Sequence, residues 1–62
     1  MTDYETVEII NGFEVQLNVN AGGFLNCRII KNGKLYVASI NHRTIQDDKL
    51  WAKRWLENNH KI

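Results

Sequence analysis

The 62-residue sequence contains one cysteine and no proline. A lone Cys27 excludes an internal disulfide bond and a cysteine-based metal site. No apolar run approaches the roughly 18 residues that a membrane-spanning helix needs, and the first residues show no signal-peptide pattern. Because a secreted domain of this size usually needs disulfide bonds for stability, we expect a reducing cytoplasm as its location.

The sequence also has little net charge. Eight Lys and Arg residues face seven Asp and Glu residues, a formal net charge of +1, so no overall field attracts phosphate groups. Hydrophobic residues make up 44% of the chain and charged residues 24%, which is typical of an ordered globular protein. We predict a single domain over residues 1–62, with a shallow core that leaves little material for an enzyme pocket.

Glycines divide the first forty residues at near-regular spacing. Gly12 and Gly33 each follow an Asn, and this pair is the strongest short-range hairpin signal. A two-residue Asn11-Gly12 loop would mix apolar and polar residues on both sheet faces, whereas a three-residue loop that includes Ile10 separates them. The same loop length is predicted at all three positions, namely 10–12, 20–22 and 31–33.

These loops predict four antiparallel strands, at about residues 4–10, 13–19, 23–30 and 34–40. The alternation of apolar residues then places one set of side chains on the inner face. That inner set includes Ile9, Phe13, Val15, Cys27, Ile29, Leu35 and Val37. Agreement of three turns on one apolar face indicates a β-meander.

After residue 40 the hydrophobic spacing changes to that of a helix. We predict a helix over about residues 45–58, with Thr44 as its N-cap and two acidic residues in its first turn. The stripe that would pack on the sheet comprises Ile45, Ala52, Trp55 and Leu56, with Trp51 at its edge. The predicted fold is therefore α+β: a four-stranded antiparallel β-meander with one C-terminal helix packed on one face.

Three chemically active side chains each have a structural explanation. Cys27 falls in a row of apolar residues, which favours a buried thiol over a reactive thiolate. His42 is close in sequence to Asp47 and Asp48, but no ligand spacing supports a metal site there. His60 falls in a C-terminal tail that we expect to fray.

Two carboxylates are expected to face each other on the outer side of the sheet. Glu8 and Glu14 would then resemble a carboxylate pair, but Arg28, next in that row, is expected to bridge them because facing like charges destabilise a sheet. No nucleophile, general base and orienting group appear together in the sequence. We expect a protein that is not an enzyme and that uses no metal or cofactor.

The uncovered sheet face is the candidate interaction surface. It combines aromatic, aliphatic and amide side chains with one arginine, a composition associated with protein interfaces. The candidate partner-binding residues are Gln16, Phe24, Asn26, Arg28, Tyr36 and Ile40. An ordinary solvent face that keeps β-forming residues for propensity is equally open. The two edge strands also invite strand addition by another protein or a second copy, as in a homodimer.

Nucleic-acid binding is the alternative function. A short antiparallel sheet plus one helix resembles sheet-reading DNA-binding domains such as the integrase arm-binding type, which place several basic and aromatic residues on the exposed sheet face. Here that face has Arg28 as its only basic residue, so a helix-borne version is the alternative. It would use Arg43, Lys49, Lys53 and Arg54.

The second half of the chain resembles small accessory proteins of bacteriophages and mobile elements. The similarity is carried by residues 32–39 (NGKLYVAS) and 51–58 (WAKRWLEN), a hairpin followed by a helix with a Trp-Leu-x-Asn close. It implies a host-takeover or anti-defence role, in which a short protein binds and blocks a host protein, and it transfers no residue roles. The sequence therefore predicts a non-enzymatic protein-binding module. The resemblance implies that it acts as an inhibitor of a host protein.

Overall fold

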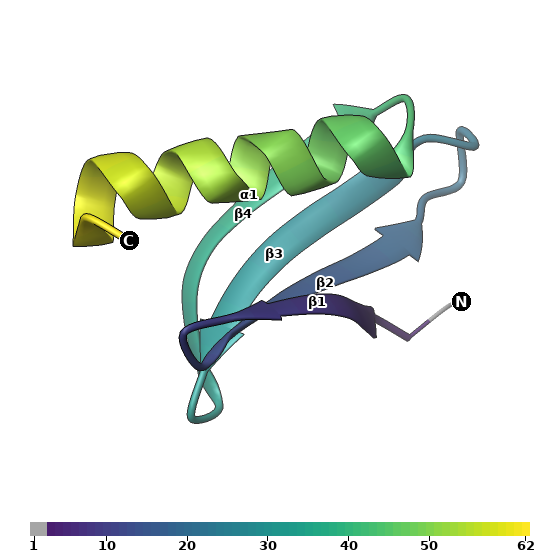
Figure 1. Cartoon of the computed structure of the whole chain (residues 1–62). Coiled ribbons are helices and arrows are strands. Elements are labelled where there is room, and N and C mark those ends of the chain that lie inside the picture. The colour runs from purple at the N-terminus through teal and green to yellow at the C-terminus, as the bar shows by residue number, and fades with distance from the viewer. Residues whose placement is uncertain (1–2) are drawn as a thin grey trace.

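The computed structural model describes residues 3–62. Strands β1 (Glu5–Ile10), β2 (Phe13–Val19), β3 (Leu25–Lys31) and β4 (Lys34–His42) lie side by side in chain order, and helix α1 (Ile45–His60) follows. The helix crosses one face of the sheet, mainly over β3 and also against β2 and β4, whereas β1 lies farthest from it (Figure 1). The predicted α+β meander with one C-terminal helix is confirmed. Within the described residues, no helix is long and apolar enough to span a membrane.

The two Asn-Gly turns have two-residue loops, so the predicted three-residue loops are wrong there. Both residues of the Asn11-Gly12 turn have positive φ angles, 49° and 84°, and the second turn matches it with 53° and 76°. Positive φ at both positions defines the turn whose twist fits two antiparallel strands, and Asn and Gly adopt it most readily. Ile10 therefore pairs with Phe13 across the first turn.

One extra residue in each of these hairpins restores the predicted faces away from the turn. Val7 is the extra residue in β1 and Tyr36 is the extra residue in β4, where the register shifts. Between each bulge and its turn the predicted faces are wrong: Ile9 and Leu35 are 65% and 55% exposed. Ile10, rather than Ile9, packs against the core.

The middle hairpin has the predicted loop length, but its loop lies one residue later, at 21–23. The Gly23 N–H donates to the Asn20 carbonyl at 3.0 Å, and Gly23 holds the left-handed conformation with φ 83°. The Asn20 side chain also accepts a hydrogen bond from the Phe24 N–H at 3.1 Å. A shift of one residue in the loop moves each cross-strand pair by two, so every side chain keeps its predicted face.

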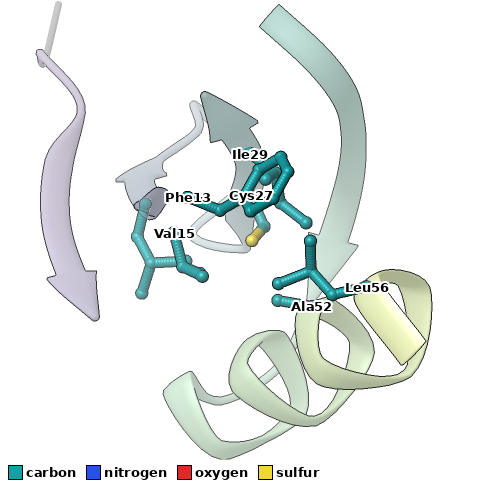
Figure 2. Close-up of a cluster of buried hydrophobic side chains, with 7 residues drawn as sticks. Phe13, Val15, Cys27, Ile29, Ala52 and Leu56 are labelled. Atoms are coloured by element: carbon teal, nitrogen blue, oxygen red, sulfur yellow. The ribbon is translucent and has the colours of Figure 1, made fainter. Parts of the chain in front are cut away.

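The core lies between the inner sheet face and a narrow stripe of the helix. Its buried hydrophobic side chains are Phe13, Val15, Leu17, Cys27, Ile29, Ala52 and Leu56. Figure 2 shows Ala52 and Leu56 pointing from the helix toward Cys27 and Ile29. Full burial of a side chain such as Leu56 contributes about 2 kcal/mol, so these few residues hold the helix on the sheet.

The helix begins as predicted and ends two residues later than predicted. Thr44 is the N-cap, and its hydroxyl accepts a hydrogen bond from the Asp47 N–H at 3.1 Å. The last helical residue is His60, and Lys61 follows in the left-handed conformation. One residue of the first turn, Asp48, is fully buried against the sheet instead of facing solvent.

Candidate functional sites

Arg28 lies at the centre of the uncovered sheet face, in a fixed position. Its Nε donates to Gln16 Oε1 at 2.7 Å, and its guanidinium carbon lies 3.8 Å from the centre of the Tyr4 ring. A cation–π contact at an exposed site contributes about 0.5–1 kcal/mol. The guanidinium is therefore held by an amide and a ring, and the predicted bridge from Arg28 to the two glutamates is absent from the described contacts.

The expected pair of facing glutamates does not form. The bulge at Val7 turns Glu8 to the side of the sheet that carries the helix, where it pairs with Val15. Glu14 stays on the outer face, and its Oε1 accepts a hydrogen bond from the Thr6 hydroxyl at 2.8 Å. The outer face therefore carries one hydrogen-bonded carboxylate and no acid–base pair.

Large apolar side chains lie at both ends of this face. Ile9 and Leu35 are exposed near the turn end, and Phe24 and Ile40 near the other end, Ile40 at 67% exposure. Of the six predicted partner-binding residues, the register places Gln16, Asn26 and Arg28 on this side. Alternation next to Leu25 and Ser39 places Phe24 and Ile40 there as well. We use the name open face for these five residues together with Ile9 and Leu35. The last two were missed because the sequence does not reveal the bulges.

Tyr36, the sixth predicted residue, lies on the opposite side of the sheet. Its ring centre is 5.3 Å from that of Phe13, at 80°, and 5.5 Å from that of His60. The bulge at Tyr36 explains this position, since the extra residue shares the side of its inward neighbour. His60 also contacts the rings of Phe13 and Trp55, so its prediction as a frayed tail residue is wrong.

The four basic residues of the nucleic-acid alternative lie just before the helix and along it, and three of them have acidic neighbours. Lys49 and Lys53 line a hollow that also contains Glu8. Arg54 lines a different hollow, beside the two tryptophans. Arg43 precedes the helix altogether. The two hollows share Asp47 and Leu50, so binding of a phosphate backbone through Lys49, Lys53 and Arg54 stays a prediction.

Ser39, His42 and Asp48 form a chain of polar contacts under the start of the helix. His42 Nδ1 lies 3.1 Å from Asp48 Oδ1, and His42 Nε2 lies 2.7 Å from the Ser39 hydroxyl. The Ser39–His42 pair is a hydrogen bond whose donor depends on the ring tautomer. The His42–Asp48 pair is a close contact without hydrogen-bond alignment, since Asp48 Oδ1 has no hydrogen-bond partner among the described residues. The three side chains therefore lie in contact, an arrangement that the sequence does not predict.

A third irregularity in the sheet makes this arrangement. In a regular strand, residues 39 and 42 would point to opposite faces. Asn41 adopts a left-handed φ of 65°, and the register shifts by one residue, so that Ser39 pairs with Cys27 and His42 with Leu25 on the inner face. Asn tolerates this conformation better than most residues, which is the one sequence signal for the bulge. The Asn20 side-chain amide donates to Asn41 Oδ1 at 3.0 Å and holds it.

Burial changes the acid–base properties of this region. Burial raises the pKa of Asp48, an effect that His42 opposes and that Asp47 reinforces. Neither oxygen of the Asp48 carboxylate has a hydrogen-bond partner among the described residues, which is costly for a buried carboxylate. Burial, followed by the charge of Asp48, raises the pKa of the Cys27 thiol to about 12. Cys27 is thus a buried, unreactive thiol, as predicted.

Comparisons with protein-family models, with curated proteins and with solved structures found no match for this chain. Within residues 3–62, no three His, Cys, Asp or Glu side chains are grouped in a way that would hold a metal ion. The functional argument therefore depends on two places in this chain: the open face and the Ser39–His42–Asp48 chain.

Proposed function

We propose that this chain is a protein-binding module that uses the open face of its sheet. The observation that carries the proposal is the exposure of Ile9, Leu35, Phe24 and Ile40 around a fixed Arg28, on the side that the helix leaves uncovered. Single exposed apolar residues are common on any protein, but several on one face are typical of interaction sites. The opposite face needs no partner because the helix covers it.

The polar centre of the open face favours binding with a small loss of side-chain entropy. Arg28, Gln16 and Glu14 already hold defined positions through hydrogen bonds, and ordering such side chains is part of the cost of association. Arginine is also enriched among residues that dominate binding energies. We infer a partner surface that is mainly apolar and places one carboxylate against the Arg28 guanidinium.

Two kinds of partner fit the open face and the sheet edges, namely a host protein and a second copy of this chain. The resemblance to small bacteriophage and mobile-element proteins supports a host protein as the target, bound and blocked in a reducing cytoplasm. A second copy that adds a strand at β1 or β4, the two edges of the sheet, is the other arrangement. Either way, the binding function proposed for the open face involves no catalysis.

Site-specific crosslinking can test the proposal. A photo-reactive residue at Ile40 should capture a protein from host lysate, with or without nuclease treatment. The same residue at Leu50 is the matched control, because Leu50 is also large, apolar and exposed, at 51%, but belongs to the helix. Ile40→Ala combined with Phe24→Ala should then weaken binding of the captured protein by at least about tenfold. Equal capture from Leu50, or capture that nuclease abolishes, would contradict the proposal.

A further inference from the structure

We propose that Ser39, His42 and Asp48 form a catalytic triad for the hydrolysis of carboxylic esters, with Ser39 as the nucleophile. The inference goes beyond the binding proposal and does not depend on it. It uses different residues, on the helix-covered side of the sheet rather than the open face. The two can therefore fail separately.

The geometry meets the requirements for an activated serine. A nucleophile and its base must lie within hydrogen-bond reach of each other, about 2.6–3.2 Å, with a third group orienting the base. The Ser39–His42 hydrogen bond of 2.7 Å falls in that range. The His42–Asp48 contact has a suitable distance, 3.1 Å, but not hydrogen-bond alignment, and such contacts often tighten only when substrate binds. The serine and the carboxylate also use different ring nitrogens, as proton transfer through the imidazole requires.

A purely structural role explains these contacts less well than a catalytic one. A structural link between β4 and the helix would be cheaper with apolar side chains, since a buried ion pair seldom gains over a well-packed apolar pair. Here Asp48 is fully buried, neither of its oxygens has a hydrogen-bond partner among the described residues, and Asn41 holds a left-handed backbone. Uncompensated buried charge and backbone strain are both concentrated at functional sites.

The reaction balances with water as the only co-reactant. The Ser39 oxygen attacks the ester carbonyl carbon, its proton moves to His42 Nε2, and the carbon–oxygen bond to the alcohol breaks as His42 returns that proton to the leaving oxygen. Water then attacks the acyl-serine, again through His42, and releases the acid. Asp48 holds the ring and stabilises the imidazolium that forms in each step. The products are one acid and one alcohol.

The surroundings indicate a small ester with an apolar or aromatic acyl group. The Trp51 ring lies 5.8 Å from the His42 ring and offers an aromatic surface beside the imidazole. Ile40 and Asn41 follow Ser39 where the pairing with β3 is irregular.

Covalent labelling with a fluorophosphonate probe tests the inference directly. The serine oxygen forms a bond to phosphorus as the phosphorus–fluorine bond breaks, the proton passes to His42, and fluoride leaves. Ser39 is the only serine in the chain, so one adduct seen by intact mass and peptide mapping identifies the site. We expect the folded protein to be labelled at Ser39 at least about 100-fold faster than the same chain unfolded in urea, as a positioned general base implies. This comparison needs no variant.

Variants then separate the roles of the three residues. Ser39→Ala should abolish both the adduct and the hydrolysis of p-nitrophenyl acetate. Asp48→Asn, nearly identical in shape, should lower the labelling rate by at least tenfold, whereas Asp47→Asn, the exposed neighbouring carboxylate, should leave it unchanged. Circular dichroism checks that each variant folds. An adduct on Thr or Tyr, equal rates in folded and unfolded chains, or equal rates in the two Asp variants would overturn the inference.

Discussion

The two ends of the helix are each joined to the sheet by a histidine, but the partners differ in kind. At the first end, His42 of β4 contacts the Asp48 carboxylate and the Ser39 hydroxyl. At the other end, His60 of the helix lies within 4.9–5.5 Å of three aromatic ring centres. Those rings belong to Phe13, Tyr36 and Trp55. The first end depends on charge and protonation, and the second on the packing of rings.

The difference shows why only one end is suited to chemistry. Rings that contact rings lose little by burial and leave no unpaired polar atom. The amino groups of Lys31 and Lys34 lie over the Phe13 and Tyr36 rings, at 4.6 and 5.1 Å from their centres, and extend this packing. The buried Asp48 carboxylate, in contrast, places a charge that is costly to bury beside an imidazole, which can gain or lose a proton. Substitutions at the two ends should therefore have different effects.

The largest effect is expected for His42→Ala. The change leaves the buried Asp48 carboxylate without the imidazole beside it, and removing one partner of a buried pair in this way costs about 3 kcal/mol or more. Urea unfolding at neutral pH measures the loss. In an Asp48→Asn background the same His42 substitution should cost much less, because no charge is left unpaired. Equal costs in both backgrounds would show that the two side chains are not coupled.

The next effect is expected for Asn41→Val. A side chain forced into the left-handed conformation costs about 1–2 kcal/mol, and Gly avoids that cost. Thermal unfolding should therefore show a clear loss for Asn41→Val and little change for Asn41→Gly. Proton NMR should also show weaker contacts between the His42 and Trp51 rings in the Val variant. Intact ring contacts in that variant would mean that the bulge does not position His42.

A smaller effect is expected for His60→Ala. The substitution removes ring contacts that contribute about 1 kcal/mol and leaves no buried charge. His60→Phe keeps an aromatic ring at this position and should recover most of the loss in a urea unfolding experiment. A cost as large as that of His42→Ala would contradict the distinction between the two ends.

The smallest effect is a difference in pH dependence. Burial raises the pKa of Asp48 in the folded state, so the stability linked to this group is fully present below the ordinary Asp pKa and is lost as pH rises through the folded value. Asp48→Asn cannot ionise. Its stability relative to the original protein should therefore increase between about pH 3 and pH 7. Asp47→Asn is the control, and parallel curves for the two variants would contradict the assignment.

The fold was predictable because the face on which each side chain lies depends on alternation along its own strand. It does not depend on which residue it pairs with across the sheet. Phe13, Val15, Cys27 and Ile29 keep their predicted inner positions even though two loop lengths are wrong and one loop is displaced. The errors at Ile9 and the turn end of β4 come from bulges, which hydrophobic alternation does not reveal. A two-residue turn with a bulge gives the same alternation of apolar residues beyond the bulge as a three-residue turn without a bulge. The hydrophobic pattern therefore does not distinguish the two.

The two candidate sites differ in how much of them the sequence reveals. Most of the open face follows from alternation along the strands, so five of its residues were predicted. The proximity of His42 to Asp48 also followed from their spacing in the chain. The contact with Ser39 did not, because it depends on the extra residue at Asn41 and on the depth at which the helix buries Asp48. The contact between Ser39 and His42 therefore becomes visible only in the tertiary structure.

The bulge at Asn41 has a consequence for how this chain can change in evolution. Deleting one codon at that position would give a regular strand and leave every side chain of β4 on its present face. The same deletion would shorten the chain between Ser39 and His42 from three steps to two and would separate the hydroxyl from the imidazole. Fold and chemistry can therefore be gained or lost independently, through an insertion or deletion of a single residue.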